Sequence, residues 1–86
     1  MNFNILSIIK QAAHERKVLR LIYIEADGTN DGWRDVEPYS FREIDNKISL
    51  FAWDIQKNGI RRFILDRIQQ AEITDAVFTP RYPVEI

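Results

Sequence analysis

Five short stretches of β-branched, aromatic and other apolar residues follow one another along most of this chain, and polar turns separate them. Short strands at such close and even spacing are typical of a small β-barrel. The sequence therefore predicts a mainly β fold, of the α+β type, with five strands. The expected strands span residues 18–25, 33–44, 47–54, 60–65 and 69–74.

A helix is expected over residues 3–16, before the first strand. Leu6, Ile9 and Ala13 recur at three- and four-residue steps, which is the spacing of one apolar helix face. A stripe of this kind must be buried, either at the open end of the barrel or against a second copy of the chain.

The chain length of 86 residues suits one domain with a modest core. We therefore expect a single domain over 1–86, with the helix at 3–16, the barrel at 18–75 and a C-terminal tail at 77–86. Pro80 and Pro83 disfavour regular structure in that tail, so we expect it to be a loop or an exposed arm.

The composition excludes several kinds of site. Because the chain has no cysteine, it has no disulfide and no thiolate metal site. It also has neither a signal-peptide pattern nor an apolar run of the roughly 20 residues that cross a bilayer. We therefore expect a cytoplasmic protein that does not bind membranes.

No enzyme signature is present. The only histidine, His14, falls in the expected helix and has no nucleophile motif near it in the sequence. Asp27, Asp31 and Asp35 are the nearest approach to a metal cluster, but their spacing is not that of a calcium loop. We expect no catalysis, no cofactor and no metal, and we interpret the acidic stretch as a solvated turn.

The segment from Gly59 to Ile68 is different, because it holds three arginines and a single acid within a strand-like pattern. Alternation places Arg61 on the face of Phe63 and Leu65, at the barrel mouth, and places Arg62 on the other face. The net charge of −1 argues against tight nonspecific binding to duplex DNA, but this segment is locally basic. Alternatively, these arginines have no ligand and belong to a solvated strand edge.

Four segments, taken in order, resemble the WYL domain, a small SH3-like or Sm-like β-barrel of bacterial transcription regulators. The resemblance runs from about Ala12 to Asp75, and its segments are Lys17–Tyr23, Val36–Tyr39, Lys47–Asp54 and Gly59–Ile68. It implies a non-enzymatic regulatory module that binds a nucleic-acid strand or a nucleotide-like, phosphate-bearing effector.

The same resemblance implies the residues of the ligand site. Arg61 and Arg67 match the first and last arginines of a family segment that helps to form a positively charged pocket. Planar guanidinium groups suit this role, because each can bind two phosphate oxygens. Three further residues are expected near them, namely Arg62, Tyr39 and Ser49.

The chain departs from the family pattern at two places. The middle arginine of the family segment is Ile64 here, and the triplet that names the domain reads Ile48-Ser49-Leu50. Ile48 and Leu50 keep the core-facing pattern, whereas Ser49 lacks the aromatic ring and phenol of the family. These changes favour a second hypothesis, an oligomerisation or protein-interaction module that has lost ligand binding.

A hairpin across residues 54–59 would set Phe51 opposite Arg62 and Trp53 opposite Ile60. With Ile64, these side chains would form an apolar face that carries one cation. The face can serve as a stacking platform for unpaired bases or as an interface with a homodimer partner or another regulator. Alternatively, the N-terminal helix covers it. The expected interface residues are Phe51, Trp53, Ile60 and Ile64.

Overall fold

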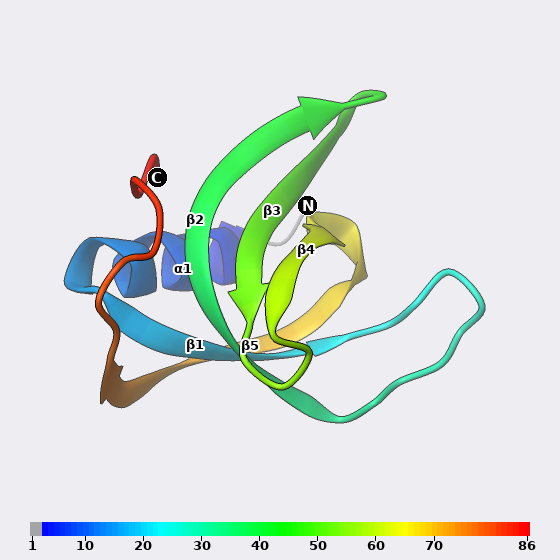
Figure 1. Ribbon diagram of the computed structural model, residues 1–86. Helices are drawn as coiled ribbons and strands as arrows, with labels where there is room; N and C mark the ends of the chain where they lie inside the picture. The colour runs from blue at the N-terminus through cyan, green and yellow to red at the C-terminus, as the bar shows by residue number, and fades with distance from the viewer. Residues whose placement is uncertain (1–2) are drawn as a thin grey trace.

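The computed structural model describes residues 3–86 and shows one helix followed by five antiparallel strands (Figure 1). This arrangement confirms the mainly β fold with an N-terminal helix. The elements are α1 (Phe3–Glu15), β1 (Lys17–Tyr23), β2 (Trp33–Ile44), β3 (Lys47–Asp54), β4 (Gly59–Ile64), a 3-10 turn η1 (Leu65–Arg67) and β5 (Ile68–Val77).

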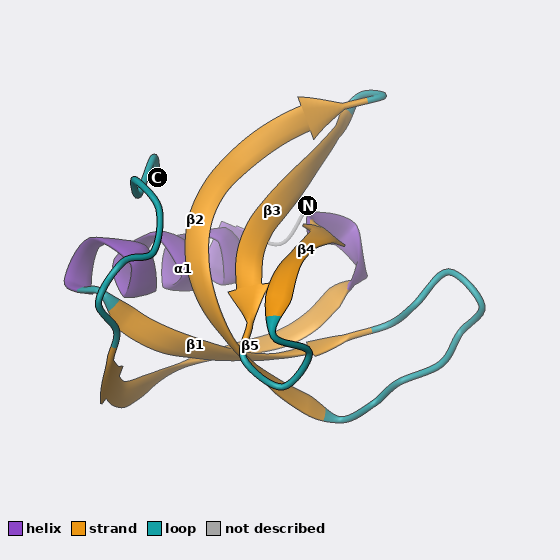
Figure 2. Cartoon of the chain, viewed as in Figure 1, coloured by secondary structure: helices purple, strands orange, loops and turns teal. Residues whose placement is uncertain are grey.

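The sheet is not closed into the expected barrel. Its strand order is β4-β3-β2-β1-β5, so β4 and β5 are edge strands although they are neighbours in the sequence. The three-residue turn η1 joins them, and the backbone N–H of Ile64 at the end of β4 donates to the Tyr23 hydroxyl at 3.0 Å. Figure 2 shows the long β2–β3 hairpin rising steeply from β1 and β5, which leaves the sheet open.

Strand β2 bends where its proline predicts a bend. Its register against β3 shifts between Pro38 and Ser40, because proline has no N–H for a ladder. Strand β4 pairs with β3 in the predicted register, with Phe51 opposite Arg62. Side chains on the two faces of this hairpin therefore alternate as the sequence predicts.

The core lies between α1 and one face of the sheet, which we call the inner face. Ile9 of the helix and Leu21, Leu50 and Phe63 of the strands are all fully buried there. Tyr23 meets Phe63 edge to face, with ring centroids 5.1 Å apart. Each fully buried large side chain contributes about 1.5–3 kcal/mol to folding. The burial of Ile9 among these strand residues therefore fixes where the helix lies.

The tail after β5 has no regular structure, and it is packed along the opposite face, which we call the outer face. Phe78 is buried against Val18 and Tyr39, and the N–H of Glu85 donates to the Tyr39 carbonyl at 2.7 Å. Within residues 3–86, no helix is both long enough and apolar enough to span a membrane.

Candidate functional site

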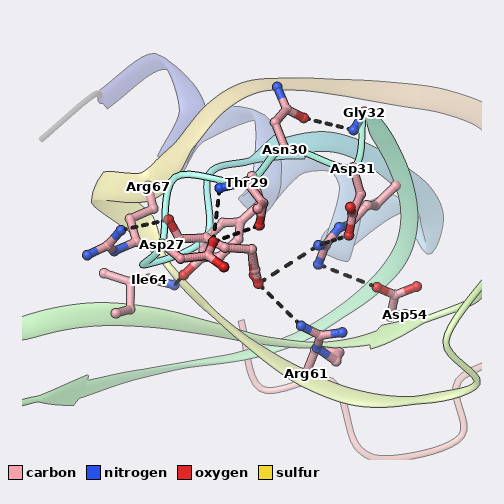
Figure 3. A network of polar contacts seen from close by, with 12 residues as sticks. Asp27, Thr29, Asn30, Asp31, Gly32, Asp54, Arg61, Ile64 and Arg67 are labelled. Atoms are coloured by element: carbon pink, nitrogen blue, oxygen red, sulfur yellow. Dashed lines mark hydrogen bonds and ion pairs between the residues drawn. The ribbon is translucent and has the colours of Figure 1, made fainter.

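Two of the three arginines predicted for the ligand site, Arg61 and Arg67, converge on one residue, Glu25, which follows β1. The Arg61 Nη2 lies 3.4 Å from the Glu25 carboxylate, and the Arg67 Nη1 donates to the Glu25 backbone carbonyl at 3.2 Å. Figure 3 shows Arg61 and Arg67 on opposite sides of the loop that follows β1. A backbone bond from the Ile24 N–H to the Arg67 carbonyl, at 3.0 Å, fixes this loop to η1.

A third arginine, Arg34, contacts the same Glu25 carboxylate. Its side chain is only 5% exposed, and its Nη2 lies 3.0 Å from the Asp31 carboxylate and 3.9 Å from that of Glu25. Its Nη1 lies 3.9 Å from Asp54, whose side chain is 1% exposed. The guanidinium carbon also lies 5.8 Å from the centre of the Phe63 ring.

Arg34 was not predicted, although one signal in the sequence points to it. Strand alternation places Arg34 on the same face as Val36, and Val36 belongs to the core. A charged residue in that register has to lie at the end of the core, where it needs acidic partners. The residues that supply them, Glu25 and Asp54, were likewise not predicted as part of the site.

The cluster is electrically balanced. It contains three arginines and three carboxylates, so the locally basic patch that the sequence predicts is neutralised in the fold; the members are Arg34, Arg61, Arg67, Glu25, Asp31 and Asp54. The contact between Arg34 and Asp54 is incomplete, since Arg34 Nε, Arg34 Nη1 and Asp54 Oδ2 are buried without a hydrogen-bond partner. Such atoms are costly in a fold, and they mark the cluster as functionally interesting.

The loop over residues 24–32 holds the acidic side of the cluster in place. Asp27 accepts hydrogen bonds from the Thr29 N–H and hydroxyl at 3.0 and 2.8 Å, and these bonds lower the pKa of Asp27 (Figure 3). Gly28 adopts a φ of +88°, which favours glycine, and its N–H donates to the Glu25 carbonyl. The acidic stretch that the sequence predicts to be a turn is thus part of a longer, internally bonded loop.

Asp27, Asp31 and Asp35 do not gather around a common point. Over the described range, 3–86, no group of three or more histidine, cysteine or acidic side chains is placed to hold a metal ion. Asp35 instead accepts a hydrogen bond from the Gln56 amide at 3.1 Å. His14 is exposed on α1, and its Nε2 lies 3.0 Å from the carbonyl of Ile86.

The other three predicted ligand residues lie away from the arginine cluster. Arg62 projects from the outer face of β4 and donates from Nε to the hydroxyl of Ser49 at 2.8 Å, and Ser49 is fully buried. Tyr39 is buried beneath the tail, where it donates to Glu37 at 2.7 Å and accepts from the Arg81 N–H at 2.9 Å. Burial raises the pKa of Tyr39 to about 12. The five predicted residues therefore occupy three separate places.

The four predicted interface residues share the outer face of the β3–β4 hairpin, and we call this set the outer patch: Phe51, Trp53, Ile60 and Ile64. Helix α1 does not cover it, because α1 packs on the inner face. The tail covers part of it instead, since the Arg81 guanidinium lies 4.5 Å from the centre of the Trp53 ring. Ile60 remains 43% exposed.

A groove of about 260 Å³ lies between α1 and the β2–β3 hairpin, apart from the arginine cluster. It is lined by three apolar and three charged residues, namely Leu6, Phe41, Ile48, Lys10, Arg42 and Glu43.

Comparison with known proteins identifies the family of this domain. The family model for the WYL domain matches residues 4–73. No curated protein matches the chain. Among solved structures, the chain is similar to Proteasome accessory factor B/C (PafBC) of Arthrobacter aurescens, with 26% sequence identity and a TM-score of 0.79. The similarity covers 95% of this chain and 14% of that one. The chain belongs to the WYL domain family.

Proposed function

We propose that this domain is a non-enzymatic regulatory module that binds a phosphate-bearing ligand, either a nucleic-acid strand or a nucleotide-like effector, through Arg61 and Arg67. One observation carries the proposal: two arginines from β4 and η1 are held at a single point, Glu25, at the end of the sheet. WYL domains occur in bacterial transcription regulators, which supports a link to transcription regulation.

Both arginines retain donors for a ligand. A guanidinium group has five N–H donors, and in the described structure Arg61 and Arg67 each donate one side-chain hydrogen bond. The Arg61 side chain is 36% exposed, and its 3.4 Å contact with Glu25 is longer than the 2.7–2.9 Å of a strong charge-assisted bond. A phosphate group therefore has donors to bind at a site that already orients them.

The test is fluorescence anisotropy with fluorescein-labelled single-stranded and duplex oligonucleotides of about 15 nucleotides, at low and near-physiological salt. The parent protein should bind the single strand, and its affinity should fall steeply with salt. Arg61→Ala should weaken binding about tenfold or more, because hydrogen bonds to charged groups are worth about 1.5–3 kcal/mol.

Arg20→Ala is the matched control, because Arg20 lies on β1 and contacts Trp33 and Glu72 instead of Glu25. It removes the same charge and should leave affinity within about twofold of the parent. If Arg61→Ala binds every oligonucleotide as the parent does, Arg61 is not the ligand residue and the proposal fails.

The outer patch favours a second candidate function, a protein-interaction module. Its Ile60 is exposed on an edge strand, β4, and unpaired edges beside apolar side chains are ready to pair with another chain. The tail already covers Trp53, so the surface available to a partner centres on Phe51, Ile60 and Ile64. The oligomeric state at high protein concentration tests this candidate.

A further inference from the structure

The Glu25 carboxylate lies where a ligand anion is expected. We propose that Glu25 is a resident anion of the site: its carboxylate occupies the position on Arg61 that the ligand's phosphate takes, and binding exchanges one anion for the other. This inference rests on the proposed function and adds the residue that sets the affinity of the site.

The geometry shows a carboxylate that two cations share without a tight bond to either. The same oxygen of Glu25 lies 3.4 Å from Arg61 and 3.9 Å from Arg34. Both distances exceed those of a strong charge-assisted hydrogen bond. The Glu25 side chain is 25% exposed, so solvent and ligands reach it. A loosely held anion between two guanidinium groups is easier to displace from either one.

Arg34 gives the displaced carboxylate a place to go. It is buried, and the atom that faces Glu25 is its Nη2, which has two N–H donors and gives one of them to Asp31 at 3.0 Å. When a phosphate takes Arg61, the Glu25 carboxylate can close its 3.9 Å gap to Arg34, so no charge is left without a partner. The site therefore avoids the cost of a free buried charge during the exchange.

Arg67 keeps the exchange local. It holds the backbone carbonyl of Glu25, not its carboxylate, and Gly28 donates to the same carbonyl at 2.9 Å. The side chain of Glu25 can therefore turn while the loop stays attached to η1. Because the cluster is neutral before binding, a ligand has to compete with Glu25 for Arg61, and ligands without an anionic group gain nothing there.

The experiment compares two substitutions that each remove one negative charge from the same loop. Glu25→Gln removes the competing anion. Asp31→Asn removes a carboxylate that pairs with Arg34 and does not contact Arg61. The probe is the same fluorescein-labelled single-stranded oligonucleotide of about 15 nucleotides. Glu25→Gln should tighten binding about fivefold, which corresponds to about 1 kcal/mol, whereas Asp31→Asn should stay within about twofold.

Glu25→Asp provides a second variant that keeps the charge. Its side chain is shorter by one methylene and does not reach Arg61, so it should also tighten binding, and circular dichroism should show that all three variants are folded. Equal tightening by Glu25→Gln and Asp31→Asn would indicate a general charge effect and overturn the inference.

The failure of this inference differs from that of the proposed function. If the parent binds in an Arg61-dependent manner and neither Glu25 variant binds more tightly, the resident-anion role is wrong and the ligand site stands. If Glu25→Gln binds the probe and the parent does not, the inference is supported. If neither protein binds any oligonucleotide, the resident-anion role and the nucleic-acid form of the proposed function both fail.

Discussion

Replacing Arg34 by methionine should destabilise the domain strongly, because it leaves a buried carboxylate without a cation. The side chains of Arg34 and Asp54 are 5% and 1% exposed, and their charged atoms lie 3.9 Å apart. At an effective dielectric constant of about 20, two unit charges at that distance attract by about 4 kcal/mol. The value falls within the roughly 3–5 kcal/mol lost when one partner of a buried ion pair is removed.

The double variant Arg34→Met/Asp54→Asn separates the electrostatic cause from lost packing. An asparagine at position 54 keeps a carbonyl oxygen that can accept the Lys57 N–H, which now donates to Asp54 at 3.1 Å. The stranded charge is then gone, so the double variant should be more stable than Arg34→Met alone. We expect a coupling free energy of about 2–3 kcal/mol between the two positions.

Urea unfolding followed by tryptophan fluorescence measures both free energies, and thermal unfolding followed by circular dichroism measures the melting temperature. Arg34→Met should lower the melting temperature by about 15–30 °C, since 1 kcal/mol shifts a domain of this size by about 4–8 °C. Asp31→Asn is the control: its side chain is 57% exposed, so its loss should cost less than about 1 kcal/mol. If Arg34→Met loses less than about 1 kcal/mol, or if the two substitutions are additive, the charge argument is refuted.

Two further predictions concern the outer face. Stability should decline between about pH 10 and pH 12, because the raised pKa of Tyr39, about 12, means that the folded state holds this proton more tightly than the unfolded chain does. Tyr39→Phe should flatten that decline in alkaline urea titrations, and an unchanged slope would contradict the assignment. If the outer patch is a subunit interface, Ile64→Arg should shift a dimer toward monomer in sedimentation equilibrium. If the parent protein is monomeric at millimolar concentration, the outer patch is not an interface between copies of this chain.

Periodicity in the sequence was enough to predict most of the fold. The register of Phe51 against Arg62 followed from the length of the turn between β3 and β4, because side chains on a strand alternate with a period of two. Barrel closure did not follow, because alternation does not determine whether two edge strands pair. Here a three-residue turn joins β4 to β5, and the N–H of Ile64 bonds to the Tyr23 hydroxyl instead.

The candidate site was predictable only where its residues are close in the sequence. Arg61 and Arg67 fall in one segment, and the fold brings both to Glu25. Tyr39 and Ser49 were grouped with them through the family resemblance, but the bulge in β2 and strand alternation direct them elsewhere. Arg34 lies far from that segment in sequence, and only its register with Val36 indicates that it is buried.

The separation of charge along the sequence is misleading for the same reason. The acidic stretch after β1 and the basic segment of β4 and η1 form two patches of opposite sign when they are counted along the chain. The antiparallel sheet brings the ends of these segments together, so that Arg61 contacts the Glu25 carboxylate and Arg67 donates to the Glu25 backbone carbonyl. Under the proposed exchange, an anion has to displace Glu25 from Arg61, so the affinity of the site would depend on how loosely Glu25 is held as well as on how many arginines are present.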